Sequence, residues 1–196
     1  MKKLLPSLSL VLLLAACVDT TGISPESTKQ PKGNAQSVAQ VIEYADLECP
    51  ACRTAYDSIT KPLFEKYGNQ ISYSFKQFPL RSIHRYTMDL AEASECAADQ
   101  GKFWEYVDMA YENQRDLKAG SATEWGNALV ADTALFSRCT RSHIKQKAIM
   151  AEYDAGVAID VLGTPTFFVN GKQVKATMED LSAAIDAQLK GAQQRL

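Results

Sequence analysis

The chain has 196 residues, of which 46% are hydrophobic and 22% charged, and its formal net charge at pH 7 is −2. This length and composition are typical of one globular domain whose core is large enough to fold without a metal or a dense disulfide framework. The slightly acidic balance excludes the basic surface that a nucleic-acid-binding protein needs.

The first residues are typical of a bacterial export signal. Met1-Lys2-Lys3 is positively charged, and residues 4–16 form an almost unbroken apolar run that ends in small residues. At about 13 residues this run is too short to cross a bilayer core of roughly 30 Å as a helix. The tetrad Leu-Ala-Ala-Cys at 14–17 resembles the lipoprotein signal. We therefore expect a signal peptide over residues 1–16 and a mature chain that begins with lipidated Cys17; the alternative is simple cleavage and release.

The segment after Cys17 has little apolar periodicity. Residues 18–37 are rich in Ser, Thr, Pro and Gly, which favours a flexible tether over 17–37. We expect one folded domain over residues 38–196.

The remaining elements alternate between strand and helix patterns. A β-prone run at 38–45 leads into Cys49-Pro50-Ala51-Cys52, and the apolar spacing of 53–67 predicts a helix with a kink at Pro62. Strict alternation over 71–78 predicts a second strand, so the start of the domain reads β-α-β. Helical patterns follow at 86–99, 102–115, 123–131 and 142–156, which predicts a helical insertion at about 82–158. A hairpin over 166–175 and a helix from Thr177 to about Lys190 complete the α/β domain.

The two cysteines of the Cys-x-x-Cys motif stand at the start of the helix over 53–67. They are close enough to form a disulfide, and the helix N-terminus favours a thiolate on the first cysteine. We expect Cys49 to be the exposed, attacking sulfur and Cys52 the buried, resolving sulfur. The alternatives for this motif are a structural disulfide and half of a zinc site.

Two further features favour redox chemistry. Glu43 lies six residues before Cys49 on the preceding strand, where a buried carboxylate would exchange a proton with Cys52; the alternative is a solvated strand residue. The stretch Gly163-Thr164-Pro165 precedes an apolar strand, and a cis bond before Pro165 would leave the Thr164 backbone free to pair with an extended substrate. The alternative is an ordinary turn proline.

The chain from about Val38 onward resembles the DsbA-like branch of the thioredoxin superfamily. The matching residues are Glu43, Asp46-Leu47-Glu48-Cys49-Pro50-Ala51-Cys52, Phe78-Pro79-Leu80 with His84, Gln100-Gly101-Lys102-Phe103-Trp104, and Gly163-Thr164-Pro165-Thr166-Phe167-Phe168-Val169-Asn170-Gly171. The resemblance implies a thioredoxin-like fold with an inserted helical domain, and four roles follow from it. These are Cys49 as nucleophile, Cys52 as resolving thiol, Glu43 as buried acid and Pro165 as the cis-proline facing the dithiol. We assign substrate binding to Pro50, Ala51, Thr164 and Pro165.

The chain also departs from the strong oxidase of this family. Ala51 stands where that enzyme has His, and Glu48 next to Cys49 disfavours the thiolate, whereas Arg53 favours it. In having a Thr at position 164, before the proline, the chain resembles the isomerase and reductase branches and several oxidases of the family alike. The sequence therefore leaves the oxidising strength of the dithiol open.

The other two cysteines of the domain are Cys96 and Cys139. In an oxidising compartment they are expected to form a structural disulfide, because the short-range pair takes the other two cysteines. The alternative, a four-cysteine zinc site, is disfavoured by the long stretch between them, so no metal is expected. His84 is a candidate for the rim of the active site, although a lone histidine is more often a surface residue.

The leading hypothesis is a monomeric thiol–disulfide oxidoreductase that is anchored by lipid in the bacterial cell envelope. It would donate its Cys49–Cys52 disulfide to cysteine-containing exported proteins, with no cofactor beyond that disulfide. The resemblance implies reoxidation by a quinone-coupled membrane partner. The runner-up is an envelope reductase or isomerase, kept reduced by a different membrane partner. A hypothesis of another class is a thioredoxin-like chaperone or binding module with an inert dithiol.

Overall fold

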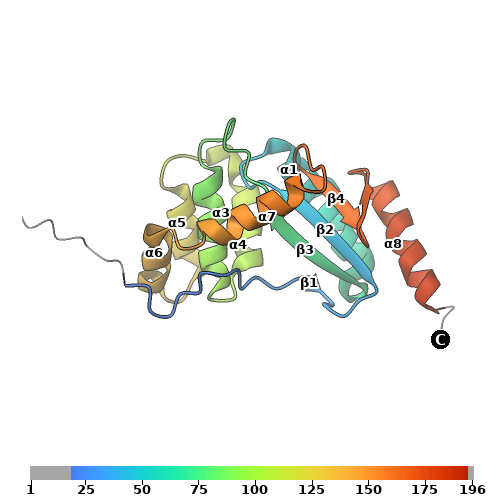
Figure 1. Ribbon diagram of the computed structural model, residues 1–196, viewed down its shortest axis with the longest axis horizontal. Coiled ribbons are helices and arrows are strands. Elements are labelled where there is room, and N and C mark those ends of the chain that lie inside the picture. Colours follow the sequence, from blue (N-terminus) through green and yellow to red (C-terminus); the bar gives the residue numbers. More distant parts are fainter. Residues whose placement is uncertain (1–18, 194–196) are drawn as a thin grey trace, which may run out of the picture.

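The computed structural model describes residues 19–193 (Figure 1), so the predicted signal peptide and Cys17 lie outside the described residues. A five-stranded sheet has the order β1-β3-β2-β4-β5. Its strands are β1 (Lys32–Gly33), β2 (Ala39–Ala45), β3 (Ile71–Gln77), β4 (Thr166–Val169) and β5 (Lys172–Val174). Strands β2 and β3 are parallel, and β4 runs antiparallel to β2. This arrangement places β2, which leads to the cysteine motif, at the centre of the sheet.

One helical stretch connects the two parallel strands. It consists of α1 (Pro50–Ala55), a π-helical turn (Tyr56–Thr60) and α2 (Lys61–Tyr67). Pro62 has no backbone N–H to donate to the preceding turn, so the regular hydrogen-bond ladder is interrupted where a kink was predicted. Ile59 and Leu63 of this stretch share a buried apolar cluster with Leu181 and Ile185 of α8 (Met178–Gln193).

Five helices lie between β3 and β4: α3 (Thr87–Ala98), α4 (Phe103–Glu112), α5 (Ser121–Leu129), α6 (Thr133–Ser142) and α7 (Gln146–Val157). Figure 1 shows α3 to α6 at one end of the molecule, α8 at the other, and α7 running between them. The sequence did not predict α6, because its apolar residues are few. Its start was nevertheless marked by Asp132, whose side chain accepts a hydrogen bond from the backbone N–H of Leu135 at 2.8 Å.

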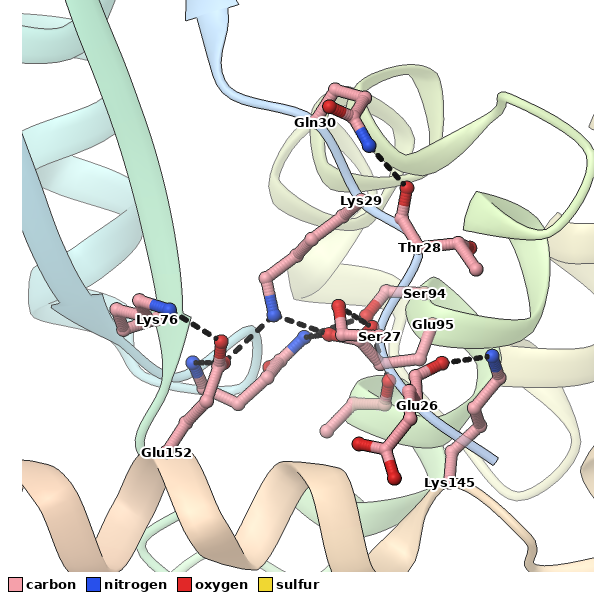
Figure 2. A network of polar contacts seen from close by, with 12 residues as sticks. Glu26, Ser27, Thr28, Lys29, Gln30, Lys76, Ser94, Glu95, Lys145 and Glu152 are labelled. Carbon is pink, nitrogen blue, oxygen red and sulfur yellow. Dashed lines mark hydrogen bonds and ion pairs between the residues drawn. The ribbon is translucent and has the colours of Figure 1, made fainter. Parts of the chain in front are cut away.

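The expectation of a flexible tether over 17–37 is wrong for residues 23–33, which pack along the helices. Ile23 is buried in the same apolar cluster as Phe136 of α6. Lys29, in the network of Figure 2, forms ion pairs with Glu95 at 2.5 Å and Glu152 at 2.7 Å. Ser27 also donates to Glu95, at 2.6 Å. The segment is coil up to β1, which pairs with β3. Its side chains supply hydrogen-bond and ion-pair partners to a buried carboxylate of α3 and a partly buried one of α7.

Within residues 19–193, none of the helices combines the length and apolar character that crossing a bilayer requires.

Candidate active site

The dithiol lies where β2 turns into α1. Cys49 has an extended backbone and caps α1, and Pro50 occupies the first turn, where a missing N–H leaves no hydrogen bond unmade. Cys52 follows one turn in. Both cysteines are free thiols. Cys49 exposes only 6% of its surface and Cys52 none. Cys49 is therefore less exposed than expected, because the segment before Pro165 lies against its sulfur. As expected, Cys49 is still the more accessible of the two cysteines.

The two thiols are electrostatically unlike. The pKa of Cys49 is lowered to about 5, chiefly because its sulfur accepts a hydrogen bond from the Cys52 thiol. Burial opposes this shift, and the Thr164 side chain and the backbone N–H groups of Cys52 and Ala51 support it. Burial raises the pKa of Cys52 well above its usual value. The pair therefore consists of a thiolate nucleophile and a protonated partner at neutral pH.

Glu43 lies on β2 beneath the motif and is 2% exposed, so the alternative of a solvated strand residue is wrong. Burial raises the pKa of Glu43 to about 7, the hydrogen bond donated by the Tyr73 hydroxyl lowers it, and the charge of Cys49 raises it further. Lys76 does not neutralise this carboxyl, because its ammonium pairs with Glu152 at 2.9 Å. A carboxyl with this pKa changes protonation state near neutral pH, as a proton acceptor for Cys52 must.

The peptide bond between Thr164 and Pro165 is cis. The Cys49 sulfur lies 3.5 Å from the carbonyl oxygen of Thr164, so this segment faces the dithiol across the site. Pro50 and Ala51 are exposed beside it. The four residues assigned to substrate binding thus lie around the Cys49 sulfur.

Sequence reasoning missed two residues that hold the motif in place. The buried carboxylate of Asp46 accepts hydrogen bonds from the backbone N–H groups of Glu48 at 2.8 Å and Leu80 at 2.9 Å. His84 contacts this carboxylate at 2.8 Å through Nδ1, so its partner is Asp46. The second residue, Gln114, donates its side-chain amide to the backbone carbonyls of Leu47 and Cys49. Asp46 was visible in the family motif, whereas no local pattern marks Gln114.

A disulfide joins the remaining predicted pair, Cys96 of α3 and Cys139 of α6, with 5.8 Å between the Cα atoms. The bond links two helices of the helical block and leaves the dithiol as the free pair. Among residues 19–193, no group of three or more His, Cys, Asp or Glu side chains is placed to hold a metal ion.

Residues 27–187 match the protein family described as Thioredoxin. The fold is similar to the crystal structure of BdbD from Bacillus subtilis, with a TM-score of 0.75 and 18% identity over 83% of this chain and 94% of that one. It is also similar to DsbA2 of Pseudomonas aeruginosa, with a TM-score of 0.63 and 22% identity over 81% and 92% of the two chains. The expected thioredoxin-like fold with inserted helices is therefore confirmed.

Among curated proteins, similarity extends to a protein named Na(+)/H(+) antiporter NhaA 3 from Salinispora tropica, which is 34% identical over 160 residues. That alignment covers 79% of this chain and 24% of the relative. A protein named Na(+)/H(+) antiporter NhaA 1 from Salinispora arenicola is 33% identical over 84% of this chain and 25% of its own length. The chain thus spans about a quarter of the length of these relatives.

Proposed function

The chain belongs to the thioredoxin family and has the fold of the DsbA-like structures, and from this premise we propose that it is a thiol–disulfide oxidoreductase acting through Cys49 and Cys52. The observation that carries the proposal is the asymmetry of the two thiols above one buried carboxyl. Cys49 is held as a thiolate at a helix start, Cys52 is buried and protonated, and Glu43 lies beneath them with a pKa of about 7.

Each of the three groups has one step in the exchange. A thiolate of the substrate attacks the Cys49 sulfur of the oxidised protein, the Cys49–Cys52 bond breaks, and Cys52 takes a proton from Glu43. A second substrate thiolate then attacks the substrate sulfur of the mixed disulfide, and Cys49 leaves as a thiolate. The substrate gains a disulfide and the protein gains two electrons.

For the direction of electron flow, we propose an oxidase. A thiolate pKa of about 5 stabilises the reduced form of the protein, which makes the Cys49–Cys52 disulfide a stronger oxidant. The groups that lower the pKa of Cys49 are the Cys52 thiol, the Thr164 side chain and backbone N–H groups, so a low pKa does not need a His at the position of Ala51. A reductase is favoured by a less stable thiolate, because its disulfide must be the weaker oxidant.

The proposed substrates are cysteine-containing exported proteins, and the proposed partner is a membrane protein that reoxidises the dithiol. We further propose that residues 1–16 are removed and that Cys17 anchors the domain of residues 38–196, with its helical insertion at about 82–158, in the cell envelope. This part rests on the sequence of the N-terminus. In cells, Cys17→Ser should move the protein from the membrane fraction to the soluble fraction. An unchanged membrane fraction contradicts the lipid anchor.

Na⁺/H⁺ antiport is not part of the proposed function, because the chain matches only about a quarter of the length of the relatives that have this name.

The exchange itself is tested with a reduced peptide that contains two cysteines. The oxidised protein should convert the peptide to its disulfide, and Cys52→Ala should accumulate a mixed disulfide through Cys49 that Cys49→Ala cannot form. In cells, Cys52→Ala should trap envelope proteins in the same way. If the wild type leaves the peptide reduced and Cys52→Ala traps no protein, the dithiol is inert and the binding-module hypothesis replaces this one.

A further inference from the structure

Glu43 has no direct access to water, although the proposed exchange loads or unloads a proton on it in every cycle. The ionisable groups that face it are Tyr73 of β3, Tyr111 of α4, and the two active-site cysteines. One carboxylate oxygen of Glu43 accepts a hydrogen bond from Tyr73, and the other has no hydrogen-bond partner among residues 19–193. The Tyr111 hydroxyl is also buried without a partner in this part of the chain. The Cys49 sulfur lies 3.5 Å from the Thr164 carbonyl, on the substrate side of the site, whereas the Tyr73 hydroxyl continues to a further hydroxyl.

The next member of this chain of hydrogen bonds is Thr60. Its hydroxyl lies 3.1 Å from that of Tyr73. A phenol has one hydrogen, so while Tyr73 donates to Glu43 it accepts from Thr60. The Tyr73 ring is fixed between aromatic neighbours, with centroid distances of 5.4 Å to Phe64 and 5.9 Å to Trp104. Glu43, Tyr73 and Thr60 thus form one ordered row of hydroxyl and carboxyl groups.

Thr60 is 5% exposed and is the member of this row that lies at a surface cavity. It ends the π-helical turn and lines a cavity of about 510 Å³ whose other walls include Glu65, Asp108 and Glu112. The Glu112 side chain is 60% exposed and that of Asp108 is 38% exposed, so the cavity wall reaches solvent. Lys32 and Lys61 line the same cavity and pair with Asp108 and Glu112. Buried hydroxyls that connect a titrating carboxyl to a solvent-facing cavity are suited to pass protons.

We propose that Tyr73 and Thr60 form a proton relay that connects Glu43 to water at this cavity, away from the face where the substrate approaches Cys49. The inference rests on the proposed function. When Cys52 is oxidised, its thiol proton passes to Glu43, and its sulfur attacks Cys49 in the mixed disulfide. The bond between Cys49 and the partner sulfur breaks, the partner leaves as a thiolate with the electron pair, and the proton leaves through the Tyr73 and Thr60 hydroxyls. The reverse reaction brings a proton inward along the same row.

The test uses the full chain with Cys17→Ser as the background for all variants. The reduced protein is mixed rapidly with an excess of an aromatic disulfide whose thiolate is coloured. Cys49 attacks the reagent, releases one coloured thiolate and forms a mixed disulfide. Cys52 then gives its proton to Glu43 and attacks Cys49, which releases the second coloured thiolate and completes the transfer of two electrons to the reagent. The second release therefore reports the step that uses Glu43.

The measurement is made at about pH 6, where Glu43 with a pKa of about 7 is mostly protonated. In the wild type, the relay exchanges the proton of Glu43 with water faster than Cys52 reacts. All molecules therefore react at one rate, and the second release has a single phase. Thr60→Val removes the hydroxyl with little change in shape, and it should split the release into two phases. The fast phase should come from the molecules in which Glu43 is already ionised, so its amplitude should equal their fraction. The slow phase should be at least about tenfold slower, a factor below the roughly 10²–10⁴-fold contribution of positioned acid–base groups.

Two further variants separate the relay from a structural effect. Thr60→Ser keeps a hydroxyl and should restore the single phase, whereas Tyr73→Phe should split it. Ser58→Ala removes an exposed hydroxyl from the same helical turn and should leave the release unchanged. A single phase at the wild-type rate in both Thr60→Val and Tyr73→Phe overturns the relay while leaving the proposed function standing. A wild-type mixed disulfide that never releases the second thiolate overturns the proposed function and the relay together.

Discussion

The side-chain amide of Gln114 donates a hydrogen bond to the backbone carbonyl of Cys49 at 3.1 Å and another to that of Leu47 at 2.9 Å. Gln114 follows α4, so this contact connects the helical block to the turn that presents the nucleophile. Gln114→Leu removes the donor and leaves the Leu47 carbonyl without this hydrogen bond, whereas the Cys49 carbonyl keeps the one from the Arg53 N–H at 3.1 Å. We expect the free energy of unfolding in urea to fall by about 1–3 kcal/mol. Gln30→Leu, at an exposed amide, is the control, and equal stability of the two variants contradicts the prediction.

The stability of the reduced protein should depend on pH through Glu43. Its pKa is about 7 in the folded state and 4.5 in its ordinary environment, so between these values the folded state binds more protons than the unfolded state. The contribution of Glu43 to the free energy of unfolding therefore falls as pH rises from about 4.5 to 7, whereas the lowered pKa of Cys49 contributes a rise above about pH 5 that the wild type and a Glu43 variant share. Glu43→Gln should remove this fall and make the protein more stable than the wild type at pH 8, by up to about 3 kcal/mol. Urea unfolding at several pH values checks this, and parallel profiles of the two proteins would refute it.

Thr164 should influence the thiolate on Cys49. Its side chain contributes to the low pKa of Cys49, which should therefore rise in Thr164→Val. Alkylation of the reduced protein with iodoacetamide reports the thiolate, and its rate should be half-maximal near pH 5 in the wild type and at a higher pH in the variant. Thr54→Val, which removes a hydroxyl bonded to the Pro50 carbonyl, is the control. An identical pH profile for wild type and Thr164→Val contradicts the role of Thr164.

The segment of residues 23–33 should contribute to folding as well as connecting the N-terminus to the domain. Lys29 is 8% exposed and pairs with Glu95, which is 1% exposed, so Lys29→Met leaves a buried carboxylate without its cation. We expect a loss of roughly 3–5 kcal/mol in the free energy of unfolding. Lys172→Met, at an exposed position, should change little. If both variants unfold at the same urea concentration as the wild type, the packing of this segment does not stabilise the domain.

The sequence predicted the elements whose signals are local. Alternation marked β3, apolar periodicity marked most of the helices, and the cysteine spacing marked the start of α1. It did not predict what depends on contacts between distant segments. The alternating pattern of residues 71–78 gives Tyr73 no role of its own, because that role depends on the parallel pairing that brings β3 beside β2.

The same limit explains the two largest errors. Residues 23–33 have the composition of a tether, and only the buried carboxylates of α3 and α7 show why they are held. Gln114 and Thr60 are polar residues without a local signature. Gln114 gains its place in the site from two hydrogen bonds to the cysteine motif, and Thr60 from one to Tyr73.

The central claim is that the dithiol donates disulfides, and the reduction potential of the Cys49–Cys52 pair tests it most directly. The protein should begin at Val18, so that the packed segment of residues 23–33 is retained, and be equilibrated against glutathione. We predict a value near about −120 mV, as found for strong oxidases whose reduced form is stabilised by a low-pKa thiolate. A value near about −270 mV, typical of thioredoxin, would contradict the oxidase and place the protein among the reductants.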